Sequence, residues 1–150
     1  MYHPDFDAFT KLARPGALVP VYREILADLE TPVAAYLKIA QGQPYAFLLE
    51  SVEQAESLGH YSFLGANPSI VFRSKGRQVT VIRNGVEENY ESPDPLQDLR
   101  ALMKTYHPVA VPGVHAFHGG AVGYLSYDQV RFFETLPDDN PDSLHLPDLY

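Results

Sequence analysis

The sequence predicts an α+β fold in which a largely antiparallel, sandwich-like β-sheet is covered by a few helices. One observation is a series of short segments rich in β-branched and aromatic residues, separated by Gly, Pro and Asn. A second is a pair of helix starts, each marked by a capping residue followed by proline. A third is that 45% of the 150 residues are hydrophobic, which is enough to bury a core. We expect residues 1–150 to form one domain.

Three segments have the residue pattern of helices. A short helix is expected between Asp5 and Pro15. Thr31 and Asp94 are predicted to cap the second and third helices, because such side chains accept a backbone N–H that a helix start leaves unpaired. The second helix should end near Gly42. The third has an apolar stripe that suits the face of a sheet, made by Leu96, Leu99, Leu102 and Met103.

Most of the chain between the second and third helices is predicted to be β-structure. Asn84-Gly85 supplies the two positive-φ positions of a tight type I′ hairpin turn, and Lys75-Gly76 is expected to serve a slightly longer one. Residues 19–25 are expected to be extended, with Pro20 restricting them to a sheet edge or the start of a strand, and residues 121–127 are expected to form an apolar strand. The other predicted strands cover residues 45–49, 61–66, 70–73, 79–83 and 86–90.

Charge and composition exclude several classes of function. The formal net charge of -8 argues against a nucleic-acid-binding face, which gathers Lys and Arg to neutralise phosphates. The absence of cysteine excludes disulfides, thiolate zinc sites and a cysteine nucleophile. The first residues carry Asp5 and Asp7 and no apolar run, unlike a secretory signal, and no segment approaches transmembrane length. We expect a cytoplasmic protein whose partners are small molecules or proteins, without nucleic acid or a membrane.

The strand predicted over residues 45–49 is very apolar and is followed at once by Glu50 and Ser51. Such a strand is expected to be buried, so that these two polar side chains emerge where the sheet meets a ligand or a loop. After a short gap, His60 and Tyr61 begin the next strand. The pattern indicates a polar pocket at a sheet margin, although the same residues also suit a turn cap and a solvated edge charge.

Catalytic and metal-binding interpretations lack the pattern that their chemistry needs. Glu50, Ser51 and His60 supply the residue types of a hydrolytic triad, but no nucleophile elbow surrounds Ser51. His115 and His118 are expected to point in opposite directions on an extended segment, which does not suit a metal. We therefore expect no catalytic residue and no metal ligand in this chain.

Two loops resemble ligand-binding loops only superficially. Residues 119–123 contain three glycines, but they lack the lysine and the strand-to-helix context of a phosphate loop. The acidic stretch over residues 138–142 lacks the alternating ligands, the glycine and the closing glutamate of an EF-hand. Sheet packing and a solvated loop explain these two segments better.

Four motifs in a fixed order give the chain a resemblance to a known family. They are Val19-Pro20-Val21-Tyr22-Arg23-Glu24, Leu48-Leu49-Glu50-Ser51, His60-Tyr61-Ser62-Phe63-Leu64-Gly65 and Gly119-Gly120-Ala121-Val122-Gly123-Tyr124-Leu125-Ser126-Tyr127-Asp128. Together they resemble the N-terminal domain of anthranilate synthase component I, a chorismate-utilising enzyme. The resemblance runs from about Asp5 to Tyr150, and four ordered motifs are far more specific than any one of them.

The resemblance implies a part in tryptophan biosynthesis, an aromatic amino acid pathway. Full-length members of the family are lyases that convert chorismate to anthranilate and pyruvate, using magnesium and ammonia that a glutamine amidotransferase subunit releases from glutamine. The catalytic C-terminal domain is expected to lie outside this chain, so residues 1–150 are expected to be inactive alone and to hold no cofactor. Their expected role is allosteric, because the family's N-terminal domain carries much of the site for tryptophan, the feedback inhibitor.

The resemblance also implies which residues contribute to the tryptophan site, namely Leu49, Glu50, Ser51, His60 and Tyr61. Glu50 suits the ammonium group of the ligand, and Ser51 is able to donate or accept a hydrogen bond. His60 stands where the family often has a basic residue and is a weaker support for the carboxylate, since histidine is largely uncharged at neutral pH. Tyr61 suits a place in the core equally well.

Two other interpretations stay open at this point. The N-terminal domain of aminodeoxychorismate synthase component I, from the folate pathway, is similar, and the reaction is decided by residues outside this chain. The second alternative is a stand-alone amino-acid-binding module without a catalytic partner. In the leading interpretation the chain lacks the domain that covers it, so exposed apolar surface and free strand edges are expected to cause self-association.

Overall fold

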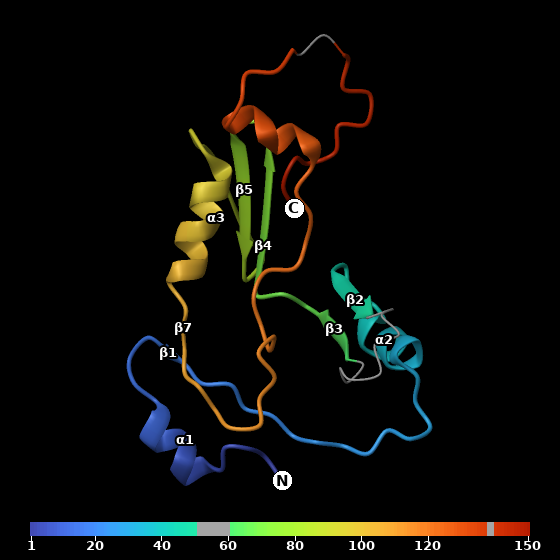
Figure 1. Cartoon of the computed structure of the whole chain (residues 1–150), viewed down its shortest axis with the longest axis vertical. Helices are drawn as coiled ribbons and strands as arrows, with labels where there is room; N and C mark the ends of the chain where they lie inside the picture. The colour runs from blue at the N-terminus through green and yellow to red at the C-terminus, as the bar shows by residue number, and fades with distance from the viewer. Residues whose placement is uncertain (51–60, 138–139) are drawn as a thin grey trace. The chain divides into compact units, whose positions relative to one another are not determined.

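The structure is a computed structural model that describes residues 1–50, 61–137 and 140–150 (Figure 1). Helices account for 23% and strands for 26% of the described residues, and the longer strands pair in antiparallel sheets, so the predicted α+β class is confirmed. The chain divides into two compact units. One unit is Leu26–Ile70, and the other combines Met1–Ile25 with Val71–Tyr150.

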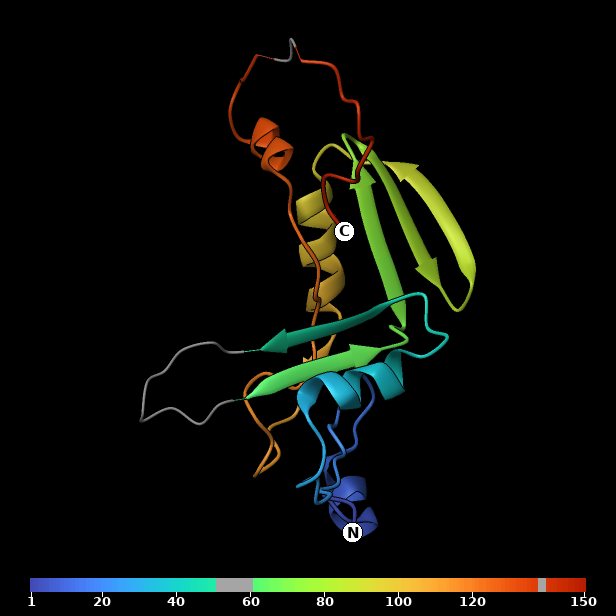
Figure 2. The same ribbon diagram turned by 90° about the vertical axis from the view of Figure 1, so that its right-hand side faces the viewer.

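The smaller unit contains α2 (Pro32–Ala40), β2 (Ala46–Glu50) and β3 (Ser62–Ala66), and the helix packs against the antiparallel hairpin (Figure 2). The Thr31 hydroxyl oxygen accepts the Ala34 N–H at 3.0 Å, which confirms the predicted cap. None of the described residues of this unit is fully buried. One helix on two strands has too little surface to enclose a core, so the expectation that residues 45–49 form a buried strand is wrong.

The larger unit contains the sheet β4 (Ile70–Lys75), β5 (Gln78–Arg83) and β6 (Val86–Glu91), in that order. Asn84 and Gly85 have φ angles of 51° and 77°, as the predicted tight turn between β5 and β6 requires. Only Gly76 and Arg77 lie between β4 and β5, so this turn is also a two-residue turn and the longer one expected there is wrong.

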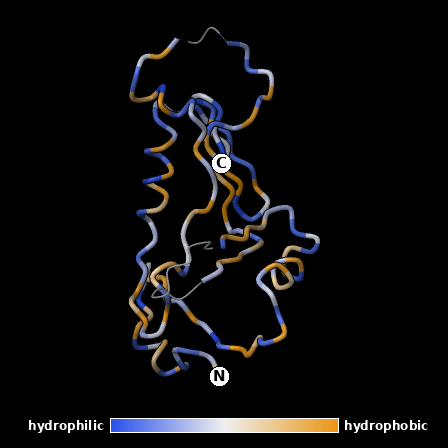
Figure 3. Tube along the Cα trace, turned by 45° about the vertical axis from the view of Figure 1, so that its right-hand side comes forward, coloured by the Kyte–Doolittle hydropathy of each residue, from blue (hydrophilic) through white to orange (hydrophobic). Residues whose placement is uncertain are grey.

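Helix α3 (Pro95–Lys104) lies along one face of this sheet (Figures 1 and 2). The Asp94 carboxylate accepts the N–H groups of Leu96 and Gln97 at 3.1 and 3.2 Å, which confirms the second predicted cap. Hydrophobic and hydrophilic residues alternate along the turns of α3 (Figure 3), as expected of a helix with one face on a sheet. The hydrophobic side chains buried in this unit are Phe72, Val79, Val81 and Leu149.

The last three residues of the chain extend the same sheet. Ser74 N–H donates to the Leu149 carbonyl at 2.9 Å, and Tyr124 N–H donates to the Tyr150 carbonyl at 2.8 Å, so the C-terminal segment lies between β4 and the segment around Leu125. The strand expected over residues 121–127 is wrong: backbone pairing with this segment is confined to Tyr124, Leu125 and Ser126, and Tyr127–Phe132 is the 3-10 helix η1.

The N-terminal residues form α1 (Phe6–Leu12) and β1 (Ala17–Leu18), and β1 pairs in parallel with β7 (His107–Pro108). The expected first helix is confirmed, with the Asp5 carboxylate accepting the Ala8 N–H at 2.8 Å. Residues 19–25 form no strand and contribute only the isolated bridge between Tyr22 and His3. Among the described helices, none combines the length and the apolar character needed to cross a membrane.

Candidate functional site

Three of the five residues predicted for the ligand site lie at the same end of the β2–β3 hairpin. The register pairs Leu49 with Phe63 and Glu50 with Ser62, and Tyr61 directly precedes β3. The end of one strand and the start of the next are therefore neighbours, although ten residues separate Glu50 from Tyr61 in the sequence. The other two predicted residues, Ser51 and His60, lie outside the described part of the chain.

The two faces of the hairpin differ in chemistry at this end. Side chains alternate along a strand and paired residues share a face, so Leu49 lies on the same face as Phe63, and Glu50 lies on the opposite face. The Tyr61 and Phe63 rings stack, with centroids 6.2 Å apart and planes 23° from parallel. Leu49 is 45% exposed and Tyr61 55% exposed, so this face presents an accessible apolar surface beside a strand end that carries a carboxylate.

Gly65 shapes the same hairpin. A β-carbon added at Gly65 would lie 2.6 and 2.8 Å from two ring carbons of Phe47, its partner on the opposite strand. The missing side chain thus lets the Phe47 ring lie across β3, as aromatic residues often do over a glycine in a sheet. The glycine belongs to one of the four ordered motifs, but the sequence alone does not show what contacts it.

The two histidines at positions 115 and 118 form hydrogen bonds with residues close to them in the sequence. His115 Nδ1 accepts the Phe117 N–H at 3.1 Å, and His118 Nδ1 lies 2.8 Å from the His115 carbonyl oxygen, to which it donates. Across the residues that the structure describes, no group of three or more His, Asp or Glu side chains is placed to hold a metal ion.

An ion cluster at the C-terminal segment is the main charged feature that the sequence analysis missed. Lys75 Nζ lies 2.8 Å from Asp142 Oδ2 and 2.9 Å from Asp148 Oδ1, and the Gly76 N–H donates to Asp148 Oδ2 at 2.7 Å. The hydrogen bond that Lys75 donates to Asp142 is the main cause that raises the pKa of the lysine, and the bond to Asp148 is the second. The bond from Lys75 also lowers the pKa of Asp142. The cluster connects the C-terminal segment to the end of β4. Because its residues are far apart in the sequence, no local sequence pattern predicts it.

Comparison with known proteins supports the family predicted from the motifs. No protein-family model matches the chain. The chain is 42% identical over 154 residues to anthranilate synthase component 1 of Synechocystis, a match that covers 97% of the chain and 30% of the relative. It is 46% identical over 131 residues to the protein of that name from Thermus thermophilus, covering 87% of the chain and 27% of the relative.

A third such protein, from Aquifex aeolicus, is 35% identical over 140 residues, a match that covers 93% of the chain and 28% of the relative. The chain thus spans about 30% of the length of these curated relatives. The resemblance predicted from the four ordered motifs is confirmed: the chain belongs to the anthranilate synthase component 1 family and corresponds to one part of its members.

Proposed function

We propose that the chain is the regulatory N-terminal domain of an anthranilate synthase component 1, and that the end of the β2–β3 hairpin forms part of its tryptophan feedback site. The carrying observation is the strand register, which pairs Glu50 with Ser62 and so brings the end of β2 to the start of β3, where Tyr61 precedes Ser62. The relatives support the choice of enzyme, because the named matches are anthranilate synthase component 1 proteins.

The chemistry of tryptophan suits this end of the hairpin. The ligand presents an ammonium, a carboxylate and an indole, so its site needs an anion, hydrogen-bond donors and an apolar surface. Glu50 at the end of β2 provides the anion, and Leu49 and Tyr61, on the other face of the hairpin at the same end, provide an exposed apolar surface for the indole. Ser51 and His60 are assigned to the polar end of the ligand on the motif resemblance.

The hairpin supplies only one side of such a site. None of the described residues of this unit is fully buried, and two strands with one helix offer no opposing wall for an indole. We assign the other wall to the remainder of a full-length protein, where the chorismate site, the magnesium ion and the contact with the amidotransferase subunit are also placed. A site shared in this way permits feedback, because a ligand changes an equilibrium only if it binds two states unequally.

Shared binding also implies reciprocity. If tryptophan favours an arrangement of the two domains that binds chorismate poorly, chorismate must weaken tryptophan binding by the same factor. The isolated chain should bind tryptophan weakly, since an exposed indole forfeits most of the roughly 1.5–3 kcal/mol gained by burying a large apolar side chain. It should also be inactive towards chorismate.

Inhibition of the full-length enzyme tests the proposal. Glu50→Gln removes the charge that faces the ammonium group and should raise the tryptophan concentration for half-inhibition about tenfold, since a hydrogen bond to a charged group contributes about 1.5–3 kcal/mol. Glu91→Gln, on the exposed strand β6, is the matched control and should leave inhibition unchanged. Wild-type inhibition of Glu50→Gln would refute the site. Tight calorimetric binding of tryptophan by the isolated chain would instead favour a stand-alone module.

A further inference from the structure

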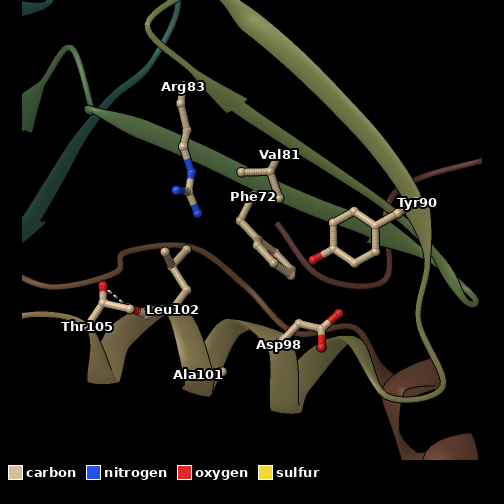
Figure 4. Close-up of a pocket in the computed structure, with 8 residues that line it drawn as sticks. All are labelled: Phe72, Val81, Arg83, Tyr90, Asp98, Ala101, Leu102 and Thr105. Atoms are coloured by element: carbon tan, nitrogen blue, oxygen red, sulfur yellow. Dashed lines mark hydrogen bonds between the residues drawn. The ribbon is translucent and has the colours of Figure 1, made fainter.

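A groove in the larger unit lies between α3 and the inner face of the β4–β6 sheet (Figure 4). Its volume is about 340 Å³, which is at the lower end of the range for sites that bind small molecules. Phe72 and Val81 form its floor from the sheet, and Leu102 closes it from the helix. None of the residues assigned above to tryptophan lines this groove.

Opposite charges occupy the two ends of the groove. The Arg83 guanidinium lies at one end, and the Asp98 carboxylate lies at the other with the Tyr90 hydroxyl facing it (Figure 4). The apolar side chains of Phe72 and Leu102 lie between the two ends. A ligand that satisfies both ends must therefore carry an anion and a cation, or another donor, on opposite sides of an apolar body.

The two charged groups differ in their partners within the protein. Among the described residues, Arg83 forms no ion pair with a carboxylate, so its guanidinium has donors available for an incoming anion. The Tyr90 hydroxyl faces Asp98 (Figure 4). Burial is the main cause that raises the pKa of Tyr90, followed by the charge of Asp98 and a hydrogen bond to it. The phenol stays protonated at neutral pH, and the Asp98 carboxylate has lone pairs available for an incoming donor.

We infer that this groove is a second small-molecule site, which takes a single-ring carboxylate bearing an ammonium or another donor at the opposite end of the ring. The carboxylate pairs with Arg83, the ring lies over Phe72, and the donor reaches Asp98. A ligand whose charges share one carbon, such as a free amino acid, satisfies only one end. The groove is thus distinct in chemistry from the tryptophan site.

The probe for the test is 4-(aminomethyl)benzoate, which carries the two charges on opposite sides of one ring. Amide chemical-shift changes in the complete 150-residue chain should be saturable and should centre on the groove-lining parts of β4, β5, β6 and α3. The ortho isomer, 2-(aminomethyl)benzoate, has the same composition with adjacent charges and should bind at least tenfold more weakly. Equal affinity for the two isomers, or shifts centred outside the groove, would overturn the inference.

Three variants and one control locate the contacts. Arg83→Gln and Asp98→Asn should each weaken the para isomer about tenfold, the effect of losing one hydrogen bond to a charged group. Ala101→Met should abolish binding by filling the groove from α3, with little change in helix propensity. Arg100→Gln, on the same helix but outside the groove lining, is the control and should keep wild-type affinity. Unchanged binding in both Arg83→Gln and Ala101→Met would refute the site, and neither variant alters the hairpin residues assigned to tryptophan.

Discussion

Replacement of Asp148 by alanine should destabilise the protein far more than replacement of Asp142, although both carboxylates pair with the same lysine. The side chain of Asp148 is 8% exposed, whereas that of Asp142 is 43% exposed and that of Lys75 is 47% exposed. Asp148 also accepts the Gly76 N–H at 2.7 Å, a bond that Asp142 does not make. The two variants therefore compare a buried carboxylate bonded to the Gly76 amide with an exposed one that pairs with Lys75 and accepts the N–H groups of Leu144 and His145 at 3.3 and 3.0 Å.

The expected magnitude follows from these contacts. A hydrogen bond to a charged group contributes about 1.5–3 kcal/mol, and the half-exposed ion pair with Lys75 adds about 0–1 kcal/mol because solvent screens it. Asp148→Ala should thus lower the free energy of unfolding by about 2–3 kcal/mol. For a chain of this length, that corresponds to a fall in Tm of roughly 4–12 °C. Asp142→Ala should change Tm only slightly.

Urea denaturation of both variants measures the difference. The midpoint for Asp148→Ala should fall while the slope stays near the wild-type value, since the same surface is exposed on unfolding. Asp142→Ala is the matched control for the loss of a negative charge beside Lys75. Equal midpoints for the two variants would refute the reasoning, because the surface ion pair would then contribute as much as the buried bond to Gly76.

Three further outcomes are expected. Gly65→Ala should destabilise the smaller unit by about 1–3 kcal/mol in the urea assay, because the new methyl group overlaps the Phe47 ring. Gly119→Ala is the control and should be nearly neutral, since nothing lies within 4 Å of the added carbon. Tyr90 should titrate above its ordinary range, and Asp98→Asn should lower the pKa of Tyr90 without fully restoring it, since burial is the first cause; NMR of labelled tyrosine rings measures this. The raised pKa stabilises the fold below the ordinary tyrosine pKa, and this contribution is lost as the pH rises through the folded-state value. In the full-length enzyme, Ser51→Phe should abolish tryptophan inhibition while largely sparing catalysis, and unchanged inhibition would remove Ser51 from the site.

The features predicted correctly from the sequence depend on neighbours within a few residues. Thr31 and Asp94 cap the helices that follow them, and Asn84-Gly85 forms its tight turn, because each of these arrangements is stabilised by hydrogen bonds and φ angles of adjacent residues. The four ordered motifs also identify the family without tertiary structure, because they are recognised from the order of residues along the chain. Leu49, Glu50 and Tyr61 were chosen from those motifs.

Tertiary structure decided everything that depends on contacts between distant segments. The apolar stretch before Tyr127 has the composition of a strand, yet only Leu125 bridges a partner, which is Leu149 of a distant segment. Asp148 appears in the sequence as one more acid of a polar tail, and it becomes a buried anchor only when the chain returns to Lys75 and Gly76. Residue types and local spacing thus determined the caps, the turns and the family, whereas strand partners, burial and the charged groove beneath α3 depend on long-range pairing, which leaves no local pattern.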